Sequence, residues 1–458
     1  MEQMTVKELL EATGGVLLCG KEEVEIRHIS IDSRAMKGND LFVPLVGEKN
    51  DAHRFITQAM DHGAAAVLTC EHDEMNAQKP WIRVTDTKKA LQDIGSYYRN
   101  RLFLPLVGVT GSVGKTTTRE MIACALSAGF QVYKTPANHN SQVGVPLTLS
   151  EITSQDEIGV IELGMSEPGE LTVIAKIARI DQAVITNIGV THIEQLGSQE
   201  NIYREKMSIQ DGLKPGGTLF LNGDDEWLRE STAKPGCKTI YYGTGANCDY
   251  RAKDILLEDG YPVFTAVHGE ERILVRLGIM GMHQVPNALA ALAVADTNGI
   301  SMKAAAEKLG QFTGFQNRQQ IYEVSGIRLI DDTYNASPVS MKAAIDILVS
   351  MKDASRRIAV LADMKELGED ALRFHYEIGT YLSECPVDVV VTFGELAEEI
   401  KKGLEEKRSD VEVKSFLELA ELEQWLCDHL RSGDSVLLKG SNSMKLGEVA
   451  DHVRQHYR

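Results

Sequence analysis

Hydrophobic residues are spaced along the chain in two alternating ways. Short apolar runs that are typical of buried strands occur at 41–47, 64–70, 104–110, 157–164, 181–189 and 217–222. Between several of these runs, apolar residues recur every three or four positions, which predicts helices, as at 5–13, 51–64 and 287–299. Strands that alternate with helices are typical of a mostly parallel sheet covered by helices. The pattern therefore predicts an α/β fold.

The apolar runs fall into three groups, which predicts three domains. Residues 1–100 form a small α/β N-terminal domain in this interpretation, and residues 101–316 form a central domain built on a mostly parallel sheet. From residue 317 to 458 the rhythm restarts, with apolar runs at 327–333, 357–363, 388–394 and 435–440, and this predicts a Rossmann-like, doubly wound C-terminal domain. A length of 458 residues agrees with about three domains of roughly 150 residues each.

Composition and charge narrow the possible functions. The formal net charge is −18 and no long Lys/Arg cluster occurs, so we expect no nucleic-acid binding, which needs a basic face. The N-terminus lacks a basic opening and no stretch approaches about 18 uncharged apolar residues, so we expect no membrane insertion and a cytoplasmic location. The seven cysteines lack paired CxxC spacing, which argues against a disulfide framework or a structural zinc. We expect a monomer.

The first candidate for chemistry is a glycine-rich loop in "LFLPLVGVTGSVGKTTTREM", residues 102–121. Its glycines allow backbone N–H groups to face an anion, and the helix expected from Lys115 adds partial positive charge at its start. Lys115 can neutralise terminal phosphates, and the Thr116 hydroxyl can bind Mg²⁺. The general nucleotide-loop pattern requires a glycine at position 109, but Val109 stands there and the nearest glycine is Gly108. The general pattern is therefore not fully met. The alternative, a purely structural turn, does not explain why strand, loop, Lys-Thr pair and helix occur in this order.

Three further side chains follow apolar runs of the central domain. Glu162 ends the strand expected at 157–164, and a carboxylate at the carboxyl end of a parallel strand can hold Mg²⁺ or orient a water. His192 follows the run at 181–189, and Lys206 lies fourteen residues later on an expected helix. Solvated surface residues are the alternative for all three, and the residues alone leave that choice open.

Polar residues farther along the chain could surround a nucleotide. His283 and Asn287 stand four apart around an expected helix start, where asparagine can pair with an adenine edge or simply cap the helix. Asp332 could accept hydrogen bonds from a ribose, and Arg318 could reach a phosphate, although "NASP" also suits a helix cap. The segments "VLADMKELGEDALRFH" and "VLLKGSNSMKLGE" follow buried strands and could serve a polar co-substrate or be ordinary loops.

Several segments occur together that are familiar from one family: "DSRAMKGNDLFVPLVGEKNDAHRF", "GVTGSVGKTTT", "NHNSQVGVPLT", "IELGMSEPGE", "TNIGVTHIEQLGS", "LNGDD", "IDDTYNASP", "LADMKELGE" and "LLKGS". The chain resembles the Mur ligases, the ATP-dependent amino-acid ligases of peptidoglycan synthesis, over nearly its whole length. The short phosphate loop is the form that this family uses. "DDTYNASP" and "DMKELGE" resemble the members that add D-alanyl-D-alanine to UDP-N-acetylmuramoyl-tripeptide, which makes these two molecules the expected substrates. The resemblance implies that ATP converts a carboxylate into an acyl phosphate, which the incoming amine then attacks.

The resemblance also implies what each domain binds. The N-terminal domain would hold the UDP end of the sugar-nucleotide peptide through Ser33, Arg34 and His53. The muramoyl-peptide would face Asn138, Asn140 and Ser141. The C-terminal domain would take the dipeptide and close over ATP, with hinges near residues 100 and 316.

At the centre, the resemblance implies ATP and two Mg²⁺ ions. The metal ligands would be Thr116, Glu162, His192 and Lys206, and Lys206 matches a position that is often carbamylated in the family. The implied catalytic residues are Lys115, Glu162, His192, Lys206 and Arg318. The implied ATP-binding residues are Thr110, Gly111, Ser112, Val113, Gly114, Lys115, Thr116, Thr117, His283, Asn287, Arg318, Asp332, Tyr334 and Asn335.

Five positions depart from the usual family pattern: Ala52, Ser208, Gln284, Asn317 and Asn442. Asn442 matters most, because it replaces a guanidinium that would suit a carboxylate of the acceptor. Other interpretations therefore stay open. One is a Mur-type amide ligase with a different acceptor, although a folate-type enzyme would not need a UDP site. The others are a kinase and a nucleotide-binding paralogue without catalysis. The paralogue is disfavoured because four candidate catalytic residues are retained together: Lys115, Glu162, His192 and Lys206.

Overall fold

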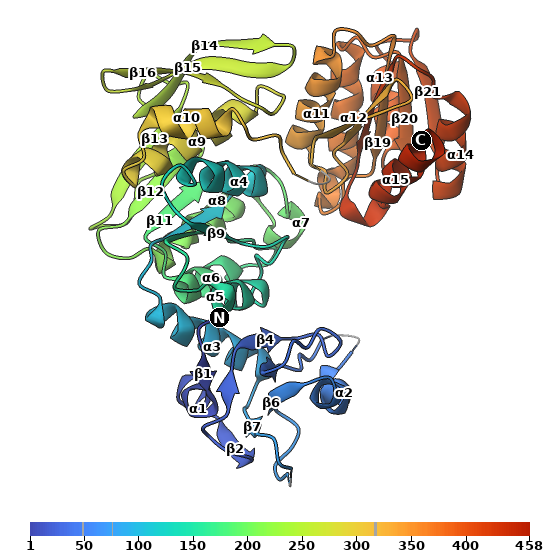
Figure 1. Cartoon of the computed structure of the whole chain (residues 1–458). Helices are drawn as coiled ribbons and strands as arrows, with labels where there is room; N and C mark the ends of the chain where they lie inside the picture. Colours follow the sequence, from blue (N-terminus) through green and yellow to red (C-terminus); the bar gives the residue numbers. More distant parts are fainter. Residues whose placement is uncertain (48–49, 76, 316–317) are drawn as a thin grey trace.

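The computed structural model describes residues 1–47, 50–75, 77–315 and 318–458. Three domains, each built on its own main sheet, follow one another along the chain (Figure 1). The N-terminal domain lies at the bottom of that view, the central domain above it and the C-terminal domain at the upper right. The sequence-based prediction of an α/β fold with three domains is confirmed.

The N-terminal domain holds a five-stranded sheet in the order β2-β7-β6-β5-β4. Its strands are β2 (Val16–Cys19), β4 (His28–Ser30), β5 (Asp40–Phe42), β6 (Ala64–Thr69) and β7 (Trp81–Arg83), and a separate small pair joins β1 (Met4–Thr5) to β3 (Glu25–Ile26). Its helices are α1 (Val6–Thr13), η1 (Ala52–Phe55), α2 (Ile56–Asp61) and α3 (Thr87–Arg101). The α1 helix begins with a capping box between Thr5 and Glu8, which supplies partners for N–H groups that the helix itself leaves free.

The central domain holds a nine-stranded sheet in the order β16-β15-β14-β13-β12-β11-β8-β10-β9. The parallel part consists of β8 (Leu106–Thr110), β9 (Val132–Lys134), β10 (Ile158–Glu162), β11 (Gln182–Ile185), β12 (Thr218–Asn222) and β13 (Lys238–Gly243). An antiparallel extension follows with β14 (Tyr250–Glu258), β15 (Tyr261–His268) and β16 (Glu271–Arg276). The helices are α4 (Lys115–Leu126), α5 (Gly144–Glu151), α6 (Glu170–Ala178), α7 (Ile193–Leu196), α8 (Gln199–Met207), η2 (Ser208–Gly212), α9 (Gln284–Thr297) and α10 (Met302–Leu309).

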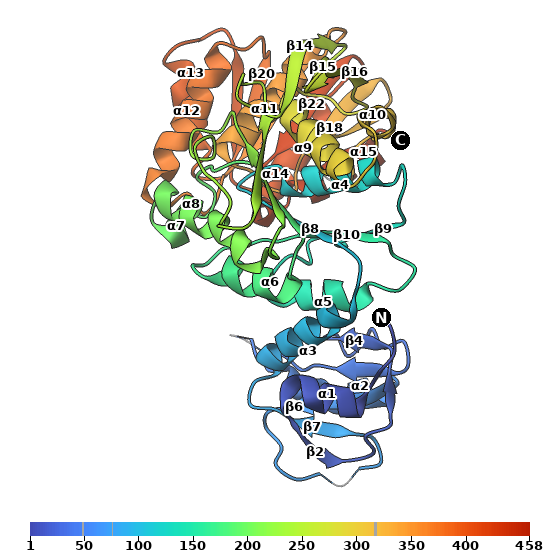
Figure 2. The ribbon, with the colours of Figure 1, turned by 90° about the vertical axis from the view of Figure 1, so that its left-hand side faces the viewer.

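Neighbouring residues of the central strands belong to different cores, because successive side chains of a strand point to opposite faces. Leu106 packs with α5 and α6, whereas Val107 packs with α4 and α9. Figure 2 shows the sheet between these two helix layers. Burial on both faces explains why the strands are continuous apolar runs in the sequence.

The C-terminal domain holds a six-stranded sheet in the order β17-β18-β22-β19-β20-β21, in which only β17 is antiparallel. Its strands are β17 (Gln320–Val324), β18 (Ile327–Asp331), β19 (Arg356–Ala362), β20 (Val389–Phe393), β21 (Glu412–Phe416) and β22 (Asp434–Lys439). Its helices are α11 (Pro338–Ser350), η3 (Gly368–Asp370), α12 (Ala371–Ser383), α13 (Glu398–Glu405), α14 (Leu419–His429), η4 (Asn442–Met444) and α15 (Leu446–His456). Apolar clusters cover both faces, as expected for a doubly wound domain.

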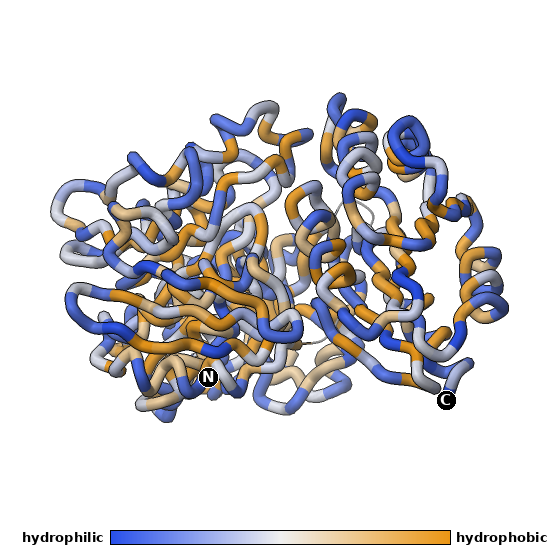
Figure 3. The backbone as a smooth tube through the Cα atoms, turned by 90° about the horizontal axis from the view of Figure 1, so that it is seen from above, coloured by the Kyte–Doolittle hydropathy of each residue, from blue (hydrophilic) through white to orange (hydrophobic). Residues whose placement is uncertain are grey.

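Figure 3 relates this layout to hydropathy: hydrophobic stretches run through the interior, and many outer loops are hydrophilic. Some predicted elements are shorter than the patterns suggested. The strand expected at 41–47 ends at Phe42, because Pro44 has no N–H for a sheet ladder. The helix expected at 51–64 begins as η1 and ends at Asp61. Within the described residues, we find no helix that combines the length and the apolar character needed to cross a bilayer.

Candidate active site

The phosphate loop has the geometry that the sequence predicts. β8 ends at Thr110, the loop turns through Gly111 and Gly114, and α4 begins at Lys115. Both glycines have positive φ, +147° and +82°, which disfavours any residue with a Cβ. At Gly111 a Cβ would also lie 1.9 Å from Thr186 Oγ1, so the close approach to β11 requires glycine. The loop is thus fixed in position with the start of α4 at its end.

The Lys115 ammonium lies within this loop. Its Nζ donates to the carbonyl oxygens of Gly111 at 2.8 Å and of Ser112 at 3.4 Å. Burial lowers the pKa of Lys115, and the charge of Arg318 acts in the same direction, while Glu162 raises it. Among the described residues, this half-buried cation contacts only backbone carbonyls and lies near one carboxylate, so it is suited to receive an anion such as a terminal phosphate.

Glu162 ends β10 inside the same cleft, with 2% of its surface exposed. Its Oε2 accepts from Arg119 Nη1 at 3.2 Å, and its Oε1 accepts from Asn140 Nδ2 at 2.8 Å. Both contacts fix the direction in which the carboxylate presents its remaining lone pairs. The hydroxyls of Thr110 and Thr191 are buried and have no hydrogen-bond partner within the described part of the chain. Carboxylate and hydroxyl oxygens are the donors that Mg²⁺ prefers, so this set fits the ion.

His192 and Lys206 approach the centre in different ways. His192 stands at the start of α7 with a left-handed backbone, φ +64°, and its Nδ1 lies 2.6 Å from Glu366 Oε2 of the C-terminal domain. That contact is the main reason that the pKa of Glu366 is lowered. Lys206, in α8, is 1% exposed, and burial together with the charge of Lys115 holds its pKa well below the ordinary value.

A network of amides lies at the start of α9. Gln284 Nε2 lies 2.9 Å from His283 Nε2, and Gln284 Oε1 accepts from Asn287 Nδ2 at 2.9 Å. Asn287 Oδ1 in turn accepts from Thr118 Oγ1 at 3.0 Å. Burial lowers the pKa of His283, which favours the neutral ring. Asn287 is therefore held between α4 and α9 rather than extended freely toward a base.

The C-terminal domain supplies the facing wall of the cleft. The guanidinium carbon of Arg318 lies 3.9 Å from the ring centre of Tyr334, a cation–π stack. Asp332 Oδ2 pairs with Lys439 Nζ at 2.5 Å, and Lys439 also donates to the Asn335 carbonyl at 3.0 Å. Lys439 is 2% exposed, so this pair is nearly dry.

These side chains surround one cleft of about 560 Å³ between the central and C-terminal domains. Most of the predicted site residues line it: Ser112, Val113, Gly114, Lys115, Thr117, Asn140, Ser141, Glu162, His192, His283, Asn287, Arg318, Asp332, Tyr334 and Asn335. Four predicted residues lie behind its wall and are buried: Thr110, Gly111, Thr116 and Lys206. Asn138 is exposed and not among the lining residues, so its role stays a prediction.

The three predicted UDP-site residues lie in the N-terminal domain, away from this cleft. Ser33 Oγ donates to Gln58 Oε1 at 2.9 Å. Arg34 is largely exposed, and its Nε and Nη2 donate to Asp32 Oδ1 and Oδ2 at 2.9 and 2.8 Å. The described contacts thus leave the Arg34 side chain at the surface, where it could exchange Asp32 for a phosphate.

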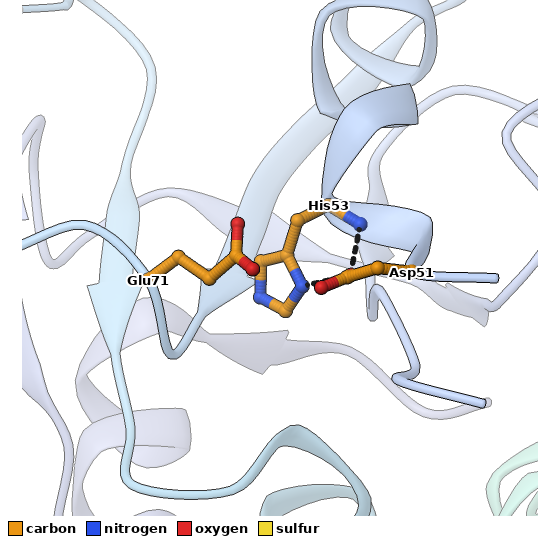
Figure 4. Close-up of side chains that lie close together, drawn as sticks. All are labelled: Asp51, His53 and Glu71. Atoms are coloured by element: carbon orange, nitrogen blue, oxygen red, sulfur yellow. Dashed lines mark hydrogen bonds and ion pairs between the residues drawn. The ribbon is translucent and has the colours of Figure 1, made fainter. Parts of the chain in front are cut away.

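His53 belongs to a cluster with Asp51 and Glu71 that has the composition of a metal site (Figure 4). Its Nδ1 lies 2.7 Å from Asp51 Oδ1, and its Nε2 accepts from the Cys70 N–H at 3.1 Å. A metal on Nδ1 would force the ring proton onto Nε2, where it would face the Cys70 N–H. Both ring nitrogens already have partners, so His53 links η1 to the end of β6 and the cluster does not favour a metal.

Sequence reasoning missed Arg119, Gln319, Glu366 and Lys439. Each acts through another polar residue of the cleft: Arg119 on Glu162, Gln319 on His283, Glu366 on His192 and Lys439 on Asp332. Lys439 lies within the apolar run at 435–440 and ends β22, and a charged residue that ends a buried strand was the available signal. The departure at Asn317 lies outside the described residues.

Comparisons with known proteins agree with this geometry. Three family models match the chain in succession: "Mur ligase family, catalytic domain" at 25–99, "Mur ligase middle domain" at 109–295 and "Mur ligase, glutamate ligase domain" at 317–442. A curated UDP-N-acetylmuramoyl-tripeptide–D-alanyl-D-alanine ligase of Bacillus subtilis is 37% identical over 455 residues, 98% of each chain. The chain belongs to the Mur ligase family. This Mur ligase is therefore an ATP-dependent ligase.

Solved structures place this Mur ligase near one branch of the family. A crystal structure of MurF from Acinetobacter baumannii superposes with a TM-score of 0.90 at 30% identity and covers 99% of both chains. MurF ligase from Thermotoga maritima, solved in complex with ADP, superposes with a TM-score of 0.83 at 29% identity, over 94% of this chain and 98% of that one. Both likenesses extend through all three domains.

Proposed function

We propose that this chain adds D-alanyl-D-alanine to UDP-N-acetylmuramoyl-tripeptide, with ATP cleaved to ADP and phosphate, in the synthesis of peptidoglycan precursors. The observation that carries the proposal is one cleft in which Lys115, Glu162 and His192 of the central domain face Arg318 and Asp332. The curated relative from Bacillus subtilis, which bears the name of this reaction, supports the choice of substrates.

The division of labour among the domains is part of the proposal. Residues 1–100 bind the UDP end, residues 101–316 bind ATP, and residues 317–458 take the dipeptide and close on the nucleotide. The muramoyl-peptide then runs toward Asn140 and Ser141, which line the cleft beside Glu162. A monomeric state in the cytoplasm completes the proposal, and light scattering after size exclusion tests the monomer.

The proposed chemistry joins a carboxylate to an amine through an acyl phosphate. The peptide carboxylate oxygen bonds to the γ-phosphorus as the bond to ADP breaks, and the amine nitrogen then bonds to the carbonyl carbon as inorganic phosphate leaves. Both partners of the first step are anions, so Lys115 and the N-terminus of α4 have to offset their repulsion. Arg318 is placed to hold phosphate oxygens from the opposite wall. Two walls that exclude water protect the acyl phosphate from hydrolysis.

The residues also fit two Mg²⁺ ions, which would supply charge neutralisation to the transferring phosphoryl group. Thr116 and Glu162 would hold them, with His192 as a nitrogen ligand. Glu162 is already oriented by Arg119 and Asn140, so its carboxylate needs little reorganisation.

Lys206 is proposed to be carbamylated. Its lowered pKa leaves a larger uncharged fraction of the amine at neutral pH, and only the uncharged amine attacks CO₂. The Nζ–carbon bond forms with loss of one proton, and the product is an anion. The carbamate would then be attracted to Lys115 instead of being repelled by it, and it could orient a magnesium ligand.

The decisive experiment follows products by mass. We expect UDP-N-acetylmuramoyl-tripeptide, ATP and D-alanyl-D-alanine to give the pentapeptide and equal amounts of ADP and phosphate. ADP release with another amino acid in place of the dipeptide would favour a different acceptor. A phosphorylated product that persists without any amine would favour a kinase. ATP binding without any amide product would favour a non-catalytic paralogue.

The carbamate has its own test. We expect Lys206→Ala to lose turnover and to regain part of it with added short carboxylates, because these can occupy the space of the carbamate. Lys206→Arg, which keeps a cation but cannot be carbamylated, should not regain activity under any bicarbonate concentration. The assignment would be contradicted if removal of CO₂ left wild-type turnover unchanged and added carboxylates did not restore the activity of Lys206→Ala.

A further inference from the structure

The linker between the central and C-terminal domains is held from both sides. Arg318 stacks on Tyr334, which belongs to the C-terminal domain. Gln319, the next residue, turns its amide toward His283 and Gln284, which belong to the central domain. Arg318 and Gln319 are adjacent in the chain, yet Arg318 contacts the C-terminal domain and Gln319 contacts the central domain.

The Gln319 amide makes two contacts at once. Its Nε2 lies 2.7 Å from His283 Nε2, and its Oε1 accepts from Gln284 Nε2 at 2.7 Å. Both amide groups present N–H donors to the same ring nitrogen, so His283 Nε2 is the acceptor and its proton is on Nδ1. Burial lowers the pKa of His283, which agrees with a neutral ring. A carboxylate could not replace this amide, because it offers no N–H to His283.

The contacts continue from the linker to the helix that follows the phosphate loop. Gln284 Oε1 accepts from Asn287, and Asn287 Oδ1 accepts from the Thr118 hydroxyl of α4. Asn287 Oδ1 also lies 3.2 Å from the position of a Cβ built on Gly114 in the loop itself. A continuous row of side-chain hydrogen bonds therefore joins α4, the helix that follows the phosphate loop, to the linker through the start of α9.

The backbone at Gln319 is unfavourable for this residue type. Its φ is +54°, in the left-handed region that residues with a Cβ rarely adopt. A glycine would adopt this conformation at no cost, so the side chain must contribute something that offsets the cost. The contribution visible in the structure is the pair of contacts to His283 and Gln284.

From this arrangement we propose that Gln319 is a positioning residue that links nucleotide binding to closure of the C-terminal domain. A nucleotide bound at the phosphate loop and the start of α9 fixes the side-chain amides of Asn287, Gln284 and Gln319 in position. Gln319 then fixes the linker in position. Arg318 then reaches the phosphates in the correct orientation. Gln319 lines the same cleft, but its proposed role is exerted through the linker and Arg318. The inference rests on the proposed binding of ATP in this cleft.

The test uses the full chain with Gln319→Ala, Gln319→Gly and the control Gln311→Ala. Gln311 is an exposed glutamine eight residues earlier in the chain. Three quantities are measured: KM for ATP, kcat, and the radius of gyration from small-angle X-ray scattering with and without a non-hydrolysable ATP analogue. Gln319→Gly removes the side chain and relieves the backbone, so it folds even if Gln319→Ala does not.

We expect both Gln319 variants to raise the KM for ATP about tenfold, as the loss of one or two buried hydrogen bonds would, and to compact less on binding the analogue. Gln311→Ala should behave as the wild type. Combining Gln319→Gly with Gln284→Ala should cost no more than the larger single loss, because both act in one network.

Two outcomes would overturn the inference. One is a Gln319→Gly chain that compacts with the analogue as the wild type does and keeps its KM for ATP. The other is a double variant whose losses simply add. A wild-type chain that neither binds nor responds to the analogue would instead contradict the proposed nucleotide cleft, so the two failures can be told apart.

Discussion

At the scale of single residues, the cleft is built from charges that are buried together. Glu162 and the Asp332–Lys439 pair are buried, and Lys115 is half-buried in the same cleft. A buried charge is tolerated when it has a partner, and it is costly when the partner is removed. Single substitutions here therefore separate residues that serve catalysis from residues that serve the fold.

Lys115→Ala should abolish turnover and leave the fold intact. Within the described part of the chain, the ammonium contacts two loop carbonyls and no carboxylate directly, so the folded chain loses little without it. The reaction loses the cation that offsets two approaching anions, which we expect to lower kcat at least about a thousandfold. Steady-state kinetics measure the loss, and circular dichroism checks the fold. Lys238→Ala, an exposed lysine of the same domain, is the control, and unchanged turnover in Lys115→Ala would reject the loop assignment.

Lys439→Met should act mainly on stability. The substitution leaves the Asp332 carboxylate buried without its cation, and breaking a buried pair costs about 3–5 kcal/mol. Urea unfolding measures the change in the free energy of unfolding. Adding Asp332→Asn to Lys439→Met should restore part of the loss, because the uncompensated charge disappears. If Lys439→Met were as stable as the wild type, the pair would not be as dry as its burial indicates.

At the scale of elements, the role of α3 differs from the role that the sequence predicted. The residues near 100 were expected to form a hinge, but the end of α3 is bound firmly to the central domain. Arg99 is 2% exposed and donates to the carbonyls of Ala178, Leu102 and Arg179 at 2.8, 2.9 and 3.0 Å. Tyr98 donates to the Ile152 carbonyl at 2.7 Å.

We expect Arg99→Met to destabilise the joint by about 3 kcal/mol, since one buried and two partly buried carbonyls and the Asp181 carboxylate lose a charged donor. Urea unfolding should then show the N-terminal domain melting separately from the rest. Arg101→Ala is the matched control. It removes an exposed ion pair with Glu8 and should change stability by less than about 1 kcal/mol. A single unchanged transition in Arg99→Met would restore the hinge interpretation.

The elements that could be predicted share a physical reason. β8, β10, β11, β12 and the strands of the C-terminal sheet except β17 and β21 are buried on both faces, so their sequences are plain apolar runs. The antiparallel extension β14–β16 was not predicted, because one face stays exposed at Leu256 and Leu274 and charged residues interrupt the runs. The phosphate loop was readable because its glycines and lysine are adjacent in the sequence.

The rest of the candidate site could not be predicted in this way. Glu366 and His192 meet although 174 positions separate them, and Gln319 meets His283 across a domain boundary. Contacts of this kind depend on how the domains dock, and no local spacing records that. The residues and the resemblance together indicated Arg318 and Asp332 and singled out the segment that contains Lys439, whereas the contacts of Lys439 and Gln319 became visible only in the structure.

At the scale of the whole molecule, the N-terminal and C-terminal domains are joined to the central domain in different ways. The N-terminal joint is a helix held by buried hydrogen bonds. Among the described residues, the C-terminal domain meets the central domain through the cleft, through Met280 and Val190, which pack against its apolar core, and through two contacts nearer the surface, His192–Glu366 and the largely exposed Lys352–Asp259 ion pair. Motion that opens and closes the cleft should therefore belong to the C-terminal domain alone. Hydrogen exchange should be slow around α3 and faster at the linker near Arg318.

Glu366→Ala tests this view of the whole molecule. The pair with His192 is partly exposed and contributes about 1 kcal/mol at most, which is enough to shift a docked-to-undocked ratio about fivefold. We therefore expect a larger radius of gyration for Glu366→Ala by small-angle scattering. In a buffer acidic enough to protonate His192, the wild type should approach the same value at high salt, which screens the pair. Glu369→Ala, an exposed acid three residues later, controls for the lost charge. Equal radii for all three chains at low salt would mean that the cleft itself, and not the ion pair, keeps the C-terminal domain docked.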